Sequence, residues 1–324
     1  MARPAIHDPR FAAGSESESI LSRIGGTPLL RLARIDADLP GVSIYAKAEW
    51  LNPGGSVKDR PALRMVQAAL RDGRLQPGKT ILDATSGNTG IAYAMIGAVL
   101  NHEVCLAIPA NAGPERRRHL QALGVRLELT DPSLGTDGAI VRAREMAAAE
   151  PDRYVYLDQY ANDENWRAHY DTTAVEIWEQ TAGCVSHFVA ALGTGGSFVG
   201  TARGLRGIGA EVENISVQPD SPFHGMEGMK HMASALTPPI YDPTLADDDI
   251  AVSTEDAYRA VKRLAHEEGL FVGVSSGAAL AGCLEVARRL PAGRSAMIVT
   301  IFPDSGARYV SERFWDEAEY DAEA

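Results

Sequence analysis

Residues 188–205 read FVAALGTGGSFVGTARGL, and this stretch decides the fold class. It opens with a short apolar run typical of a buried strand, and apolar positions recur at helical spacing from Val199 to Leu205. Between them lies Gly193-Thr194-Gly195-Gly196-Ser197, whose glycines let backbone amides converge at a helix N-terminus. Strand, glycine-rich turn and helix predict a βα unit with a phosphate-binding site at the turn. A simple tight turn would explain the glycines about as well.

The same alternation of short apolar runs and helical patterns continues through most of the chain from residue 79, as expected for βα units and parallel sheets. Strands are predicted at 80–83, 104–108, 127–129, 155–157, 187–192, 215–218 and 297–301. Helices are predicted at 59–72, 88–101, 114–123, 136–149, 163–181, 197–206, 255–267, 276–289 and 306–313. The sequence therefore predicts an α/β protein with helices on both faces of mostly parallel, twisted sheets.

The length of 324 residues suits two lobes better than one. No linker and no repeat marks a boundary, so the lobes are placed by their motifs. Residues 51–160 are expected to form a smaller, mobile N-terminal lobe, and residues 1–50 with 161–324 a larger C-terminal lobe. Residues 221–250 contain four prolines and few periodic apolar positions. They predict either a long surface loop that shapes the substrate site or, at even odds, a disordered insertion.

Composition and charge exclude several classes of protein. The formal net charge of −12 disfavours binding to nucleic acid or to anionic membranes. No apolar run is long enough to span a membrane, and the first twenty residues predict no secretory signal. The cysteines Cys105, Cys184 and Cys283 form no C-x-x-C pair, so we expect buried thiols in a reducing cytoplasm. The eight histidines show no metal-ligand spacing, and we expect no metal site.

Small residues form four clusters where predicted strands end or helices begin. They lie at 52–60, 85–90, 193–197 and 273–277. Lys58 ends the glycine-rich part of the first cluster, just ahead of a helical pattern, where its cationic form is disfavoured and its amine becomes more nucleophilic. An isolated lysine is usually a solvated surface group, and only the other clusters argue against that reading. Because the spacings of a P-loop and of a dinucleotide fingerprint are missing, a cofactor anchored by its phosphate fits best.

The chain resembles the cysteine synthase and cystathionine β-synthase family of fold-type II enzymes, which depend on pyridoxal 5'-phosphate (PLP). The resemblance runs from Ile24-Gly25-Gly26-Thr27-Pro28-Leu29 to Pro303-Asp304-Ser305-Gly306, and four motifs recur in the family's order. It implies two lobes like those of the tryptophan synthase β chain, and PLP as cofactor.

The resemblance also implies roles for individual residues. Lys58 would hold PLP covalently and act as general base, and Asn88 would donate a hydrogen bond to its phenolic oxygen. Gly193, Thr194, Gly195, Gly196 and Ser197 would bind its phosphate. Ser275 would contact the pyridine nitrogen, and a hydroxyl there makes the ring only a moderate electron sink, which favours β-elimination.

Four further residues match the part of the family's site that binds the substrate carboxylate. They are Thr85, Ser86, Thr89 and Gln159. A helix N-cap would explain Thr85, Ser86 and Thr89 equally well, and a structural hydrogen bond is nearly as good an explanation for Gln159. Both roles are compatible.

The reaction implied is β-replacement, in which an O-activated L-serine and sulfide give L-cysteine. The donor is O-acetylserine or O-phosphoserine. Residues 222–232 depart from the family's loop for O-acetylserine, and Lys230 and His231 could offer charge to a phosphate, although solvated loop residues are the better interpretation. In the stretch Thr172-Thr173-Ala174-Val175-Glu176-Ile177, the family often has Gly-Pro at the positions of Ala174 and Val175, and we expect a changed helix start.

Three other functions stay open at this point. They are cystathionine formation from serine and homocysteine, dehydration of serine or threonine, and a catalytically silent PLP-fold binding partner. An intact Lys58 and phosphate-binding turn argue against the silent protein. The resemblance further implies a homodimer and a possible serine acetyltransferase partner.

Overall fold

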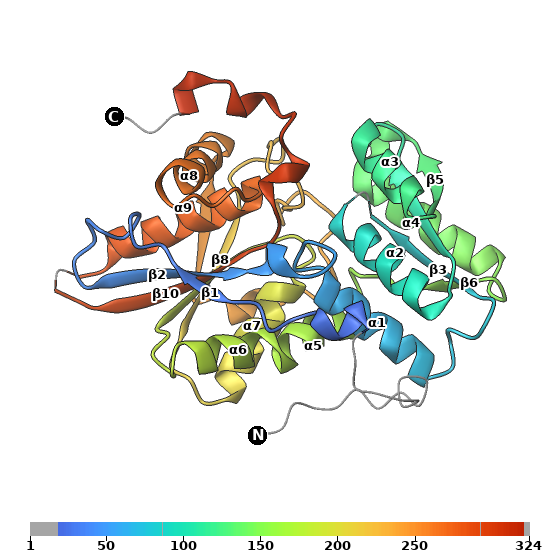
Figure 1. Cartoon of the computed structure of the whole chain (residues 1–324), viewed down its shortest axis with the longest axis horizontal. Helices are drawn as coiled ribbons and strands as arrows, with labels where there is room; N and C mark the ends of the chain where they lie inside the picture. Colours follow the sequence, from blue (N-terminus) through green and yellow to red (C-terminus); the bar gives the residue numbers. More distant parts are fainter. Residues whose placement is uncertain (1–18, 86, 292, 321–324) are drawn as a thin grey trace.

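Two mostly parallel sheets organise the computed structural model, which describes residues 19–85, 87–291 and 293–320 (Figure 1). The larger sheet has the order β1-β2-β10-β7-β8-β9, and only β1 is antiparallel to its neighbour. Its strands are β1 (Leu29–Arg31), β2 (Val42–Ala48), β7 (His187–Ala191), β8 (Glu213–Pro219), β9 (Asp248–Val252) and β10 (Ala296–Phe302). The smaller sheet is parallel throughout, in the order β5-β4-β3-β6. Its strands are β3 (Thr80–Ala84), β4 (Val104–Pro109), β5 (Arg126–Thr130) and β6 (Tyr154–Tyr156).

Helices cover both faces of the smaller sheet, because its central strands are apolar on both sides. Ile81 of β3 packs on one face with the cluster of α1, α2 and α3, and the next residue, Leu82, packs on the other face with α4. Successive residues of a strand point to opposite faces, so a run that is buried throughout requires two layers of helices. These helices are α1 (Asp59–Arg71), α2 (Asn88–Leu100), α3 (Pro114–Ala122) and α4 (Gly135–Ala149).

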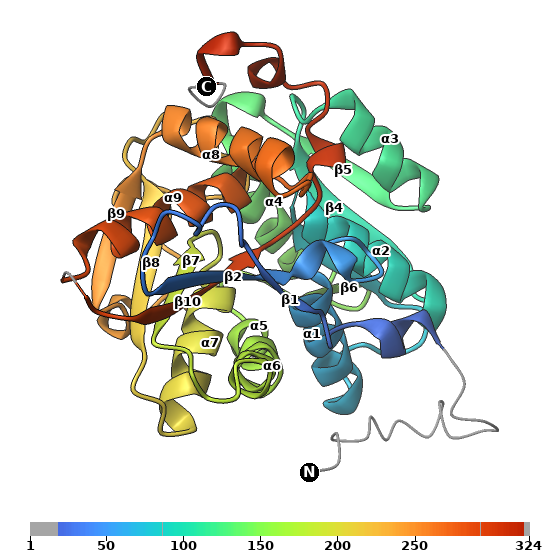
Figure 2. The same cartoon turned by 60° about the vertical axis from the view of Figure 1, so that its left-hand side comes forward.

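The larger sheet is covered in the same way, which Figure 2 shows with α8 and α9 on one face and α5, α6 and α7 on the other. Phe188 of β7 packs with α6 and α7, while Val189 packs with α8 and α9. The helices are α5 (Asp163–Asp171), α6 (Thr173–Gln180), α7 (Gly196–Gly207), α8 (Thr254–Glu267) and α9 (Val274–Arg289). The predicted α/β class is confirmed, with the site-bearing turns at the carboxyl ends of β3 and β7.

Two predicted helices differ in the structure. The helix expected over 163–181 is two helices, because Thr172 leaves the helical conformation (φ −125°, ψ −67°) and its hydroxyl donates to the Ala168 carbonyl (2.6 Å). α6 thus starts at the threonine pair where a changed helix start was expected. The helix predicted at 306–313 is wrong. That stretch holds only a short 3-10 turn, Gly306–Arg308, and the side chains of Arg308 and Tyr309 reach back to the site.

Three strands escaped prediction, and one loop is more buried than expected. β1 has three residues, β9 begins with two aspartates, and β2 lies outside the regular βα pattern. The segment 221–247 is not a purely surface loop, since Met226, Met229 and Met232 are buried in it. One cysteine prediction is also wrong: Cys105 and Cys283 are buried, but Cys184 lies exposed in the turn after α6.

No helix within the described ranges is long and apolar enough to cross a membrane.

Candidate active site

Lys58 lies at the N-terminal boundary of α1, with its loop held against the end of β10. The Val57 N–H donates to the Pro303 carbonyl (2.8 Å), and the Lys58 N–H donates to Ser56 Oγ (3.2 Å). The side chain is half-buried, and among the described residues its amine makes no hydrogen bond or ion pair. Burial lowers the pKa of Lys58, and the negative charge of Asp304 opposes that shift. The amine is therefore poised to react or to take up a proton.

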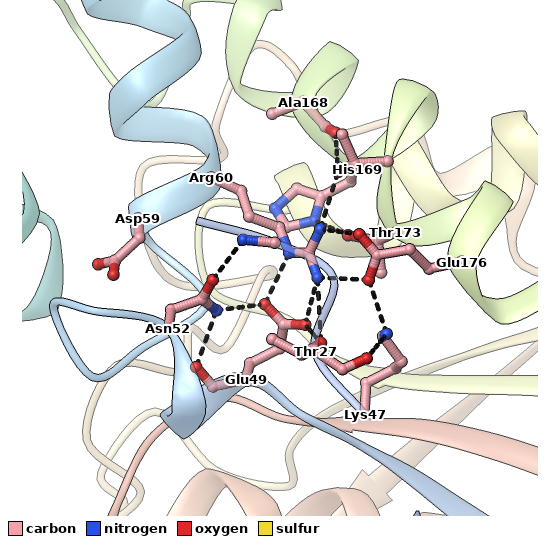
Figure 3. A network of polar contacts seen from close by, with 12 residues as sticks. Thr27, Lys47, Glu49, Asn52, Asp59, Arg60, Ala168, His169, Thr173 and Glu176 are labelled. Carbon is pink, nitrogen blue, oxygen red and sulfur yellow. Dashed lines mark hydrogen bonds and ion pairs between the residues drawn. The ribbon is translucent and has the colours of Figure 1, made fainter. Parts of the chain in front are cut away.

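Arg60 anchors α1, and with it Lys58, through a buried network of charges (Figure 3). Its guanidinium contacts Glu49 (2.8 Å) from the η3 turn Glu49–Leu51 and Glu176 (2.7 Å) from α6. Lys47 of β2 completes the network with an ion pair to Glu176 (2.7 Å). Two cations and two carboxylates compensate one another, which a charge cluster this buried requires. Arg60 thereby ties α1, which begins directly after Lys58, to the η3 turn and to α6.

The glycines of the turn after β7 let other parts of the chain pack closely against its backbone. Gly195 has a left-handed conformation (φ +86°), and a Cβ on Gly193 would lie 2.4 Å from the Gly228 carbonyl oxygen. Thr194 Oγ1 accepts from the Gly196 N–H (3.3 Å), and the half-buried Ser197 hydroxyl follows at the start of α7. Backbone amides at a helix start and hydroxyls are the groups that bind a phosphate.

The residues expected at the substrate carboxylate lie next to this turn through one chain of hydrogen bonds. The Thr89 hydroxyl donates to Gln159 Oε1 (2.8 Å), and Asn165 Nδ2 donates to the Gln159 carbonyl (2.6 Å) and to Thr194 Oγ1 (3.2 Å). Thr85 is buried, and its hydroxyl accepts from the Gly87 N–H (3.3 Å). Ser86 falls outside the described residues. Asn165 was not singled out from the sequence, because an asparagine inside a helix carries no motif.

Asn88 and the turn before α9 meet at Asp304. Asn88 Nδ2 donates to Asp304 Oδ2 (2.8 Å), and the Gly273 N–H donates to the Asp304 carbonyl (3.0 Å). Beyond Gly273, Ser275 is half-buried, whereas Ser276 is fully buried and its Oγ lacks a partner in the described part of the chain. Both serines lie at the start of α9. The contact to a ring nitrogen that the sequence predicts for Ser275 stays a prediction.

All four clusters predicted from the sequence thus gather at one site. Asn88 and Thr89 are neighbours, and they connect through Asp304 to the Lys58 loop and through Gln159 to the turn after β7. The site offers an amine that has no hydrogen-bond partner among the described residues, a glycine-rich turn at the start of α7, and hydroxyls on both sides. These residues fit a phosphate-bearing aldehyde cofactor.

The comparison with family models agrees with this geometry. The chain belongs to the family described as "Pyridoxal-phosphate dependent enzyme", whose model matches residues 20–304. It is a PLP-dependent enzyme.

Particular relatives narrow the class. The chain is 50% identical over 303 residues to a cysteine synthase of Aquifex aeolicus, covering 93% of each protein. The solved cysteine synthase of Entamoeba histolytica superposes with a TM-score of 0.87 at 35% identity, over 98% of this chain and 95% of that one. The O-acetyl serine sulfhydrylase isoform 3 of the same organism gives 0.86 at 34% identity, over 97% and 95%.

Proposed function

We propose that this protein is a PLP-dependent cysteine synthase, which makes L-cysteine from O-acetyl-L-serine and sulfide by β-replacement. The observation that carries the proposal is the Lys58 amine, half-buried and without a hydrogen-bond partner among the described residues, in one site with the glycine-rich turn 193–197 at the start of α7. The relatives named above support the same reaction.

The cofactor, when bound, supplies an electron-accepting ring that makes the substrate Cα proton acidic. Lys58 removes this proton and later returns it, a task suited to an amine whose pKa is lowered by burial. Thr85 and Thr89 hold the substrate carboxylate at the start of α2, with Gln159 behind them. Asn88 and the hydroxyl of Ser275 orient the ring, and the turn 193–197 holds the phosphate.

The contacts of Lys230 and His231 favour an acetyl over a phosphoryl leaving group. Lys230, the cation that could have met a phosphate, forms an ion pair with Asp137 (3.2 Å) and lies over the Tyr160 ring. His231 Nδ1 hydrogen-bonds Ser234 Oγ (2.8 Å). Both side chains are engaged within the chain, so neither is available as a dedicated phosphate ligand.

The test is a visible spectrum of the purified holoenzyme mixed separately with O-acetylserine, O-phosphoserine and serine, without sulfide. We expect O-acetylserine to change the cofactor band and, once sulfide is added, to yield cysteine. Cystathionine from serine and homocysteine would instead support the cystathionine synthase, and ammonia without any nucleophile a dehydratase. If none of the three amino acids changed the spectrum, the proposal would be wrong.

A matched pair of lysine variants separates an enzyme from a silent scaffold. Lys58→Ala should remove the visible band and lower cysteine formation by at least about a thousandfold, since it removes both the covalent link and the base. Lys79→Ala, which replaces a partly buried lysine whose amine donates to the Pro151 carbonyl, should leave both unchanged. A Lys58→Ala protein that kept the band would contradict the assignment.

We also propose that the protein is a cytoplasmic homodimer whose smaller lobe, residues 51–160, closes over the substrate, and that serine acetyltransferase is a partner. These points rest on the resemblance to the family. Light scattering should give twice the chain mass, and mixing with a serine acetyltransferase should give a larger complex. A monomer in the first measurement, or no complex in the second, would contradict the respective part.

A further inference from the structure

The side-chain amide of Asn88 is bonded at both ends to residues that follow β10. Nδ2 donates to Asp304 Oδ2 (2.8 Å), and Oδ1 accepts from Arg308 Nη1. A carboxylate can only accept and a guanidinium can only donate, so these two neighbours permit a single orientation of the amide. The second N–H of Asn88 makes no hydrogen bond within the described part of the chain and remains available.

The segment that carries Asp304 and Arg308 also contacts the other two sides of the site. Arg308 Nη2 donates to the Gly54 carbonyl (2.6 Å) in the loop that leads to Lys58. Asp304 pairs with Ser56 in an isolated antiparallel bridge, and its carbonyl accepts from Gly273. The two residues that orient Asn88 are therefore built into the frame that holds the reactive lysine.

The contacts of Asp304 matter energetically because its carboxylate is buried. It is 1% exposed, its Oδ1 has no hydrogen-bond partner among the described residues, and Oδ2 accepts from both Asn88 and the Tyr309 hydroxyl (2.8 Å). A buried carboxylate costs free energy unless it is compensated. Burial raises the pKa of Asp304, and the hydrogen bonds from Asn88 and Tyr309 and the nearby positive charges of Arg308 and Lys58 oppose that shift.

We propose that Asp304 and Arg308 are positioning residues that set the orientation of the Asn88 amide, so that its available N–H faces the phenolic oxygen of the cofactor. The inference rests on the proposed function, because it takes Asn88 as the residue that meets this oxygen. Neither residue makes or breaks a bond in the reaction. Both act through Asn88, and that distinguishes them from residues that merely stabilise the fold.

The test is a double-variant cycle read by cofactor binding and spectrum. Wild type, Arg308→Gln, Asn88→Ala and the double variant are titrated with PLP, and the visible band is recorded across pH. We expect Arg308→Gln to raise the dissociation constant of the cofactor about tenfold, through the loss of the charge-assisted hydrogen bond to Asn88, and to shift the band. In the Asn88→Ala background, adding Arg308→Gln should change both quantities much less, because only the bond to the Gly54 carbonyl is then lost.

Arg64→Gln is the matched control, since it removes another partly buried arginine that ties α1 to Glu164 (2.7 Å). It should lower the melting temperature without moving the band. If Arg308→Gln does not fold, Asp304→Asn, which keeps the shape and removes the charge, takes its place in the cycle.

A shift that is absent, or that persists at full size in the Asn88→Ala background, would overturn the proposal. Cysteine formation by the wild type is measured separately. Its failure would refute the proposed function and leave the cycle readable, because the cycle requires only bound cofactor.

Discussion

Gly193 shows how one residue without a side chain shapes the site. A Cβ at this position would lie 2.4 Å from the carbonyl oxygen of Gly228, which is backbone and cannot rotate away. The two segments, one at the end of β7 and one 35 residues later, are therefore packed in direct backbone contact. Overpacking at such a contact costs about 1 to 3 kcal/mol of stability.

Gly193→Ala should consequently lower the affinity for PLP by at least about tenfold and reduce the melting temperature. Spectrophotometric titration of the cofactor-free protein and thermal unfolding measure the two effects. Gly113→Ala is the control, since nothing lies within 4 Å of a Cβ there. Equal affinities for the two variants would contradict the argument.

His169 makes stability depend on pH at a single residue. Burial lowers the pKa of His169 to about 3, with the Arg60 charge adding to the effect, from the 6.5 expected of an unfolded histidine. The unfolded chain therefore binds one more proton between these values, so stability present above pH 6.5 is lost as the pH falls towards 3.

His169→Asn, which retains a group for the bond to Thr173 Oγ1, should make the unfolding free energy less steep by up to about 1.4 kcal/mol per pH unit between about pH 6 and 4. Urea unfolding of the cofactor-free protein at several pH values measures this slope. His119→Asn replaces an exposed histidine and should leave the slope near that of the wild type. An unchanged slope in His169→Asn would refute the assignment.

Sequence motifs predict some residues of the site but not others. Lys58 and the turn 193–197 could be predicted because glycines, a helix start and a reactive side chain lie together in sequence. Asp304 and Arg308 could not, since their partner Asn88 is more than 200 residues away. Long-range contacts of this kind leave no periodic or local signal.

At the scale of elements, α1 depends on the buried ion pair between its residue Arg60 and Glu49, which Figure 3 shows. Burial favours a neutral Glu49, but the Arg60 charge and the hydrogen bonds from Arg60 and Thr27 lower the pKa of Glu49 to about 2. The stability that this pair contributes is present above about pH 4.5 and is lost as the pH falls towards 2.

Glu49→Gln should cost about 3 kcal/mol near neutral pH, because Arg60 keeps only Glu176 as a charged partner. The difference from wild type should shrink in acid, and denaturant unfolding at both pH values measures it. Glu128→Gln removes a surface ion pair with Arg142 (2.7 Å) and should cost under about 1 kcal/mol. Similar costs for the two variants would show that the network adds nothing.

β3, β4 and β7 are mostly apolar, buried runs followed by helical patterns, so their type follows from local sequence. β2 was missed because it lies outside the regular βα pattern, and β9 was missed because its two aspartates and exposed Ala251 leave only two buried apolar residues. The helix at 163–181 was drawn through Thr172 because its periodicity continues.

At the scale of the whole molecule, Asp137 of α4 links the helices of the smaller sheet to the segment after β8. Asp137 of α4 accepts from Lys230 Nζ (3.2 Å) and from the Leu236 N–H (3.3 Å). The same segment donates the Lys230 N–H to the Leu192 carbonyl (2.9 Å) just before the phosphate-binding turn.

Asp137→Ala should therefore speed amide hydrogen exchange in residues 228–240 roughly fivefold, the factor that about 1 kcal/mol corresponds to. Exchange in β3 should not change. Arg142→Ala, on the same helix but paired only with Glu128 and Glu145, serves as control. Unchanged exchange in 228–240 would mean that the contact does not hold the segment.

β10 pairs with β2 on one side and β7 on the other, so residues 296–302 occupy the middle of the larger sheet. They are synthesised after all the other strands of both sheets. Until then β2 has no partner except β1, and β7 lacks one neighbour, while every strand of the smaller sheet, residues 80–156, has already emerged. Until β10 is made, the larger sheet of the nascent chain is in two separate pieces, and the Lys58 loop, whose Val57 N–H donates to the Pro303 carbonyl, gains this support only after the other strands have been made.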